Sequence, residues 1–173
     1  MRRLGAATLS ADAVVHELYE DPEVRAAVVA RWGDEVAPDG EIDRRAVAHR
    51  AFATQEDRAW LEQLIWPKVR ERVAEWRAVE STREPPPRAL VVEVPLLFEA
   101  GQASAYDATV AVVADDAVRA ERAAARGHEA VDERTARQLT QQEKAERATY
   151  VVHNSGTLEE LEQELSSLLA KLT

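Results

Sequence analysis

The sequence contains no cysteine among its 173 residues. Disulfide bonds, thiolate catalysis and cysteine-ligated zinc are therefore excluded. The four histidines show neither the HExxH spacing nor another metal-binding pattern, so we predict no metal-ligating set of side chains. The Gly-x-Ser-x-Gly turn of many serine hydrolases is also absent, and a hydrolase of that type is unsupported.

Long apolar runs are missing as well. No stretch approaches the roughly 18 to 20 apolar residues that span a bilayer, and residues 1–10 lack the apolar core of a secretory signal. We therefore expect a cytoplasmic protein without a membrane partner. With 46% hydrophobic residues, the chain is long enough for one domain with a real core. We predict a single domain over residues 1–173 that acts as a monomer.

Positive charge is in deficit. The chain has 22 basic and 32 acidic residues, which gives a formal net charge of −10. Such a chain is a poor general nucleic-acid binder, because neutralising phosphates needs a basic surface. The arginines nevertheless cluster in one short range, as Arg119, Arg122, Arg126, Arg134 and Arg137. This asymmetry favours a small anionic ligand such as a nucleotide.

The sequence patterns separate a helical part from an alternating part. Residues 13 to about 84 carry helical apolar periodicity and three candidate helix caps, Asp21, Asp43 and Thr54. Pro67 is expected to end one helix before another runs from Lys68 to about Glu80. Beyond three consecutive prolines, strands alternate with helices, which predicts an α/β fold with a parallel sheet. The expected strands are 89–94, 108–113 and 150–152, and the expected helices are 117–126, 132–148 and a last one opening at Thr157.

The last helix carries leucines at spacings of three and four. They are Leu158, Leu161, Leu165, Leu168 and Leu172. We expect this stripe to pack against the sheet, and a zipper with a partner helix is the alternative.

The stretch Ala89 to Gly101 combines a short apolar strand with a polar turn. The strand stops at Pro95, and Leu96, Glu99 and Gly101 follow. A buried parallel strand delivers its carboxyl end to a ligand site in this way, so the turn is a candidate substrate region. An ordinary core strand is the alternative explanation.

Two further polar residues stand at strand ends. Asp12 follows a short strand within residues 4–9 and precedes a helix expected from Ala13, where its carboxylate can orient a hydroxyl or accept its proton. A capping role in that helix is the alternative. Asn154 follows the last strand, where open parallel sheets bind ligands, although a plain turn also explains this residue.

The clustered arginines have a helical spacing. Arg122 and Arg126 are four residues apart, and Arg134 and Arg137 are three apart, so each pair shares a helix face. Guanidinium groups bind phosphate oxygens bidentately and can close over a nucleotide. The alternative is a solvated helix face balanced by neighbouring carboxylates.

In chain order, the segment Leu9 to Asp12, the arginine helices, Lys144 and Asn154 resemble the dephospho-CoA kinase family of P-loop nucleotide kinases. The resemblance runs along nearly the whole chain. It implies a P-loop kinase-like parallel sheet, a helical acceptor-binding region at about 13–84 and an arginine-rich helical lid at about 116–147. It also implies ATP-dependent phosphorylation of the ribose 3′-hydroxyl of dephospho-CoA, the last step of CoA biosynthesis, with ATP and Mg²⁺.

The same resemblance implies roles for individual residues. Asp12 is the catalytic carboxylate beside the ribose 3′-hydroxyl, and Asn154 contacts the adenine of ATP. The lid and phosphate-binding residues are Arg122, Arg126, Arg134, Arg137 and Lys144. The substrate region contains Trp66, Pro95, Leu96 and Glu99.

Three positions depart from the family pattern. Ser10 and Glu93 stand where many members have aspartate, and Trp66 stands where members usually have histidine. The indole of Trp66 can still stack against the adenine of the acceptor.

The 173 residues contain no Gly-Lys pair and hence no GxxxxGK[ST] loop. In the resembled family a strand and this loop precede the residues that match Arg2 to Ala7, and the strand lies in the middle of the sheet. We therefore expect unpaired or rearranged edges on the strands at Val91 and Val110, weak ATP binding and little activity for the chain as printed. A late start codon and a true truncation both remain open. The alternative function is a non-catalytic protein that binds a CoA-like ligand or serves as a scaffold.

Overall fold

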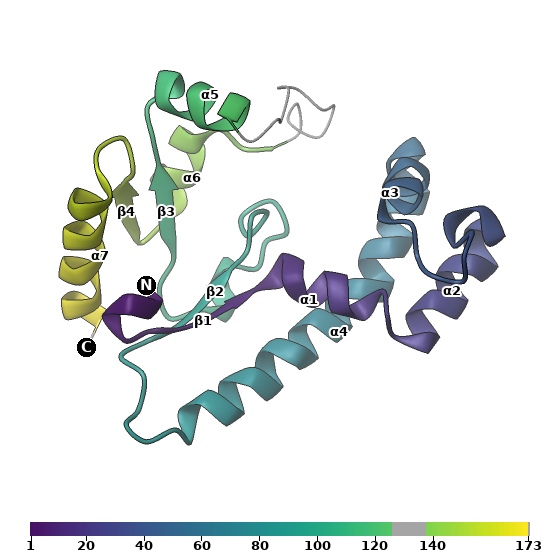
Figure 1. Ribbon diagram of the computed structural model, residues 1–173, viewed down its shortest axis with the longest axis horizontal. Coiled ribbons are helices and arrows are strands. Elements are labelled where there is room, and N and C mark those ends of the chain that lie inside the picture. Colours follow the sequence, from purple (N-terminus) through teal and green to yellow (C-terminus); the bar gives the residue numbers. More distant parts are fainter. Residues whose placement is uncertain (126–137, 173) are drawn as a thin grey trace. The chain divides into compact units, whose positions relative to one another are not determined.

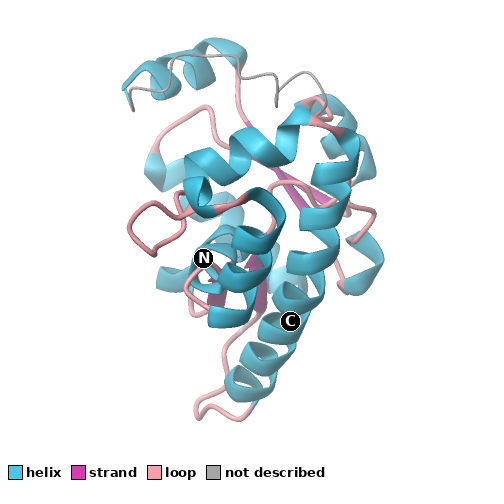
Figure 2. Ribbon diagram, turned by 90° about the vertical axis from the view of Figure 1, so that its right-hand side faces the viewer, coloured by secondary structure: helices cyan, strands magenta, loops and turns pink. Residues whose placement is uncertain are grey.

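The computed structural model describes residues 1–125 and 138–172 (Figure 1). Within them the chain forms seven α-helices and four β-strands, and Figure 2 shows short strands between longer helices. The chain divides into two compact units. We call Ala7–Glu93 the helical unit, and Met1–Ala6 together with Val94–Thr173 the C-terminal unit.

The helical unit has two parallel strands and four α-helices. The strands β1 (Ala7–Ser10) and β2 (Leu90–Glu93) pair with Ser10 opposite Glu93. Between them come α1 (Ala11–Leu18), α2 (Pro22–Trp32), α3 (Arg44–Ala53) and α4 (Gln55–Ser81), with a short 3-10 turn, η2 (Asp34–Val36). The apolar core consists of Val14, Leu18, Val24, Val28, Val36, Val47 and Ile65.

The caps of this unit lie where the sequence predicts them. The carboxylate of Asp21 accepts from the N–H of Glu23 at 2.8 Å, and that of Asp43 accepts from the N–H of Arg45 at 2.8 Å. Thr54 caps α4 by accepting from the N–H of Asp57 at 3.0 Å. Each cap satisfies a backbone donor that the helix itself leaves unpaired, which fixes where the helix begins.

Two helix boundaries differ from the prediction. The break expected at Pro67 is wrong, because α4 continues through this residue. Proline removes one helical hydrogen bond, but Ile65 and Val69 pack into the same core on either side of it, and this packing outweighs the local cost. The first helix begins at Ala11 rather than Ala13, with Ser10 as its N-cap residue.

The C-terminal unit contains a second pair of parallel strands. The strands β3 (Val110–Val113) and β4 (Tyr150–His153) pair with Val110 opposite Tyr150. Its described helices are α5 (Asp116–Ala125), α6 (Gln141–Arg147) and α7 (Leu158–Leu172), and two 3-10 turns lie at Arg2–Leu4 and Ala103–Ala105. Helix α6 packs against β3 and α7 against β4.

Helices α6 and α7 refine two predictions. Helix α6 starts at Gln141, after the capping residue Thr140. The helix predicted for residues 138–140 is therefore wrong, and residues 132–137 lie outside the described residues. The expected packing of α7 on the sheet is confirmed, with Leu168 and Leu169 buried. The ends of the predicted stripe, Leu158 and Leu172, are exposed.

The α/β fold and the parallel strand pairing are therefore as predicted. Among the described residues, β2 pairs only with β1 and β3 only with β4. The expected unpaired edges of the strands at Val91 and Val110 are thus present.

Candidate functional site

Asp12 lies in the first turn of α1, immediately beyond the carboxyl end of β1. The N-cap residue of α1 is Ser10, so the alternative that Asp12 caps this helix is wrong. The side chain of Asp12 is exposed and has no hydrogen bond or ion pair with any described residue. A carboxyl group in the first turn of a helix is favourably placed in the helix dipole, and Asp12 offers exposed oxygens at this strand end.

Glu93 ends the neighbouring strand. In the parallel register Glu93 stands opposite Ser10, and its side chain is exposed. Ser10 is two residues before Asp12. The carboxyl ends of β1 and β2 therefore bring Ser10, Asp12 and Glu93 to one edge of this sheet, as expected for a ligand site in an open parallel sheet. Trp66 lies on α4 in the same unit and is half-buried.

A polar and aromatic cluster joins α2 to the start of α4. The carboxylate of Asp57 accepts from Thr54 at 2.8 Å, from Arg31 at 2.8 Å and from the indole of Trp32 at 3.2 Å. The hydrogen bond from Thr54 and those from Arg31 lower the pKa of Asp57 below its ordinary value. Trp32 packs edge-to-face on Trp60 with ring centroids 5.0 Å apart. Because Asp57 is surrounded by partners, we interpret this cluster as a clamp between two helices.

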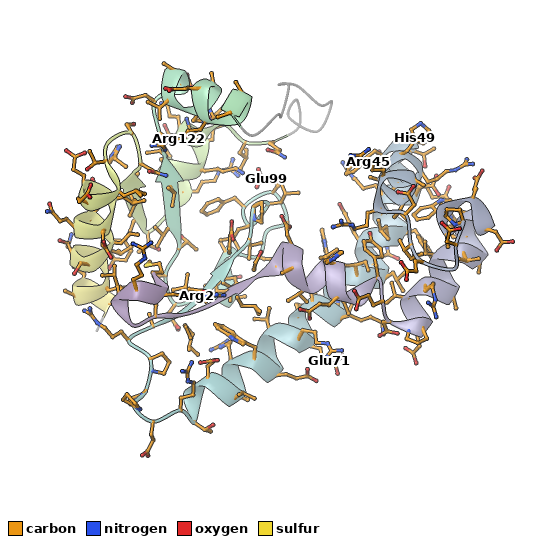
Figure 3. All side chains as sticks on the ribbon, viewed as in Figure 1. Arg2, Arg45, His49, Glu71, Glu99 and Arg122 are labelled. Atoms are coloured by element: carbon orange, nitrogen blue, oxygen red, sulfur yellow. The ribbon has the colours of Figure 1, made fainter. Side chains whose placement is uncertain are left out.

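In the C-terminal unit, Arg122 and Asn154 are brought together. Nη1 of Arg122 donates to the carbonyl oxygen of Asn154 at 2.6 Å, from α5 to the loop after β4; Figure 3 labels Arg122 on α5. The N–H of Asn154 donates to Val113 at 2.7 Å, and the next residue, Ser155, accepts from the N–H of Asp115 at 2.8 Å. The backbone of Asn154 is therefore fixed between β3, β4 and α5.

Glu99, Pro95 and Lys144 form a second contact among the predicted residues (Figure 3 labels Glu99). Nζ of Lys144 lies 3.0 Å from Oε1 of Glu99 and donates to the carbonyl oxygen of Pro95 at 2.9 Å. Burial alone raises the pKa of Glu99, but the Lys144 ammonium and nearby backbone N–H groups outweigh it and hold that pKa below its ordinary value. Leu96 is 45% exposed, so the turn also presents an apolar side chain to solvent.

Gln141 has a positional role that the sequence did not reveal. Its Oε1 accepts from the N–H of Ala114 at 2.9 Å, and its Nε2 donates to the carbonyl oxygen of Ala114 at 2.9 Å. This double contact joins the first turn of α6 to the end of β3. The capping signal at Thr140 indicates a helix start, but nothing in the sequence identifies Ala114 as the partner.

The remaining predicted lid residues, Arg126, Arg134 and Arg137, lie outside the described residues. Within residues 1–125 and 138–172, no group of three or more histidines and carboxylates could hold a metal ion by itself. In the same ranges no helix combines the length and apolar character needed to cross a membrane.

Comparison with known proteins gives one consistent result. The family model described as "Dephospho-CoA kinase" matches residues 1–160. The dephospho-CoA kinase of Deinococcus radiodurans is 37% identical over 175 residues, covering 99% of this chain and 83% of that protein. That of Protochlamydia amoebophila is 34% identical over 176 residues, covering 99% of this chain and 87% of the relative.

A solved structure agrees with these sequence matches. The crystal structure of TT1252 from Thermus thermophilus superposes with a TM-score of 0.80 at 34% identity. The superposition covers 99% of this chain and 87% of the TT1252 chain. The similarity therefore extends over both the helical and the C-terminal unit.

Proposed function

Because the chain belongs to the dephospho-CoA kinase family, we propose that it transfers the γ-phosphoryl group of ATP to the ribose 3′-hydroxyl of dephospho-CoA, giving CoA and ADP. The family consists of ATP-using phosphotransferases that act on small molecules in CoA biosynthesis. The observation that supports an acceptor site in this chain is Asp12, an exposed carboxylate just beyond the end of a parallel strand.

The reaction joins the ribose 3′-oxygen to the γ-phosphorus of ATP and breaks the bond between that phosphorus and the oxygen bridging it to the β-phosphate. The hydroxyl proton leaves as the new bond forms, and the carboxylate of Asp12 is our candidate to orient the hydroxyl and accept this proton. ADP leaves with the electron pair of the broken bond. Positive side chains around the phosphates then stabilise the charge that develops in the transition state.

The positive side chains proposed for this task are the arginines of the lid region. Arg122 lies beside Asn154, so a nucleotide whose adenine reaches Asn154 would bring its phosphates into the same unit as these arginines. Arg126, Arg134 and Arg137 keep the phosphate-binding role that the sequence predicts. Guanidinium groups suit this role because each can bind two phosphate oxygens at once.

Mg²⁺ fits this chemistry through its preference for oxygen ligands. The described residues offer no three-residue metal group, whereas Glu93 offers an exposed carboxylate at the end of β2. Mg²⁺ in kinases is commonly held by one or two carboxylates together with substrate phosphates, so Glu93 is our candidate. When bound, the ion supplies charge neutralisation on the β- and γ-phosphates.

The second hypothesis is a non-catalytic protein that binds a CoA-like ligand. The 173 residues contain no GxxxxGK[ST] sequence, whose backbone N–H groups and lysine hold the phosphates in P-loop enzymes. We expect the chain as printed to bind ATP weakly. ATP affinity should rise when a strand and a loop of this type precede residue 1. The monomeric state and the cytoplasmic location remain predictions.

The experiment measures CoA formation from dephospho-CoA and ATP by chromatography. It compares the 173-residue chain with the same chain extended at its N-terminus by such a strand and loop. The Asp12→Asn variant of the extended chain should lose turnover by roughly 10²- to 10⁴-fold, because it removes a group that acts mainly in the transition state. Its Michaelis constant for dephospho-CoA should change little.

The matched control is Glu17→Gln, which removes another exposed carboxylate from the same helix. It should leave turnover unchanged. An extended chain that binds dephospho-CoA but forms no CoA would support the binding protein instead of the enzyme. Normal turnover in Asp12→Asn would contradict the catalytic role of Asp12.

A further inference from the structure

Glu99 connects three separate segments of the C-terminal unit. Its Oε1 accepts from the backbone N–H of Leu139 at 3.0 Å and lies 3.0 Å from Nζ of Lys144. The same ammonium donates to the carbonyl oxygen of Pro95 at 2.9 Å. One carboxylate and one ammonium thus join the turn after β2, the residues that lead into α6, and α6 itself.

The turn that carries Glu99 is held together by its own backbone. The N–H of Ala100 donates to Leu96 at 2.9 Å, and the N–H of Gln102 donates to Leu97 at 3.0 Å. Gly101 closes the turn with φ of 65°, a left-handed conformation that glycine adopts without strain. The turn is therefore braced by its own hydrogen bonds, and a contact at Glu99 also restrains Leu96 and its neighbour Pro95.

The surroundings of Glu99 shield its side chain from solvent and make it depend on the contact with Lys144. Its side chain is only 16% exposed, and Oε2 is buried without a hydrogen-bond partner among the described residues. A buried carboxylate is costly unless an opposite charge compensates it, and the compensating charge here is Lys144. Removing Lys144 alone should therefore be worse than removing both charges together.

We propose that Glu99 and Lys144 are a positioning pair, which holds the Pro95–Gly101 turn against α6 so that Pro95 and Leu96 meet the acceptor in one fixed orientation. The acceptor-binding role of the turn rests on the proposed function. For Lys144 this assignment takes the place of a direct phosphate contact, because its ammonium already binds Glu99 and the Pro95 carbonyl.

The test titrates dephospho-CoA into the 173-residue chain by calorimetry, for the wild type, Glu99→Gln, Lys144→Met and the double variant. Each single variant should bind roughly tenfold more weakly, and the double variant should be no weaker than Lys144→Met, because the two residues act as one unit. Lys144→Met should also melt at a lower temperature than the double variant. The control is Glu146→Gln, an exposed carboxylate on the same helix, which should bind like the wild type.

Amide hydrogen exchange provides the second readout. In Glu99→Gln the Leu139 amide should exchange faster, while the amides of Ala100 and Gln102 keep their wild-type rates. Uniformly faster exchange, additive losses of affinity, or wild-type affinity in both single variants would each overturn the positioning pair. A wild-type chain that does not bind dephospho-CoA would contradict the proposed function and the acceptor-orienting role. The Leu139 amide would still report whether the pair holds α6.

Discussion

The helical unit and the C-terminal unit are stabilised by different kinds of contact. In the helical unit, seven buried apolar residues from four α-helices and the turn η2 form one cluster, and Val24, Val28 and Val36 are completely buried. In the C-terminal unit, the buried apolar residues among those described are fewer, and segments are joined by hydrogen bonds between side chains and the backbone. These join Gln141 to Ala114, Glu99 to Leu139, Lys144 to Pro95, Arg122 to Asn154 and Ser155 to Asp115.

The difference shows how the two units place their candidate site residues. In the helical unit, strand register sets the position of Asp12 and Glu93, and Leu9 of β1 packs against the apolar core. In the C-terminal unit, single polar contacts hold the turn at Pro95 and the loop at Asn154. A single hydrogen bond can hold a loop in place through only two groups. The loss of one of these groups leaves the other polar group without a partner.

The largest effect is expected in the apolar core. Val28→Ala removes two methyl groups from a completely buried position and should lower the free energy of unfolding by about 2 to 3 kcal/mol. Urea denaturation followed by circular dichroism measures this change. The control, Val79→Ala, acts on a 64% exposed residue of α4 and should cost less than about 0.5 kcal/mol. Equal losses in the two variants would show that the valine core does not carry the stability of this unit.

A smaller effect is expected from a polar contact of the C-terminal unit. Gln141→Leu keeps the apolar bulk but leaves the N–H and C=O of Ala114 unpaired, which should cost about 1 to 2 kcal/mol. Denaturation in urea and hydrogen exchange at the Ala114 amide measure the change. The matched control is Gln142→Leu, because within the described residues the side chain of Gln142 hydrogen-bonds to the exposed Glu146 alone. If both leucine variants lose the same stability, polar contacts do not distinguish the C-terminal unit from the helical unit.

The smallest effect concerns pH and the clamp at Asp57. Its pKa is lower in the folded protein than the ordinary value of 3.8, because Thr54 and Arg31 bind the ionised form. The stabilisation is therefore complete above the unfolded pKa and is lost as pH falls through the folded pKa. Between pH 7 and about pH 3, the wild type should lose more stability than Asp57→Asn.

Melting temperatures at the two pH values test this expectation. The control is Glu71→Gln, an exposed residue of the same helix, which should follow the wild type. Parallel pH curves for the wild type and Asp57→Asn would mean that the clamp contributes nothing that depends on pH.

Local chemistry accounts for the parts of this structure that the sequence predicts. Asp21, Asp43 and Thr54 cap their helices because each side chain reaches backbone donors two or three residues away. Alternation of strands with helices predicts parallel pairing. The structure shows it for β1 with β2 and for β3 with β4. The predicted strands end next to Asp12 and Asn154. These positions at strand ends are why the sequence predicts both as site residues.

The parts that escape prediction depend on contacts between distant residues. Pro67 predicts a break by local rules, and only the packing of Ile65 and Val69 keeps α4 continuous. Glu99 and Lys144 are 45 residues apart in the sequence, and Gln141 and Ala114 are 27 apart, so no spacing rule pairs them. Charge or polarity alone identifies such residues as candidates, while the fold selects their partners.

The edge-to-face pair of Trp32 and Trp60 has an optical consequence. All four tryptophans of the chain, Trp32, Trp60, Trp66 and Trp76, lie within Ala7–Glu93, whereas the C-terminal unit contains tyrosines but no tryptophan. Tryptophan emission therefore reports on the helical unit alone, and far-ultraviolet dichroism reports on both units. If the two signals change at different urea concentrations, the units unfold separately, and a single probe would conceal this.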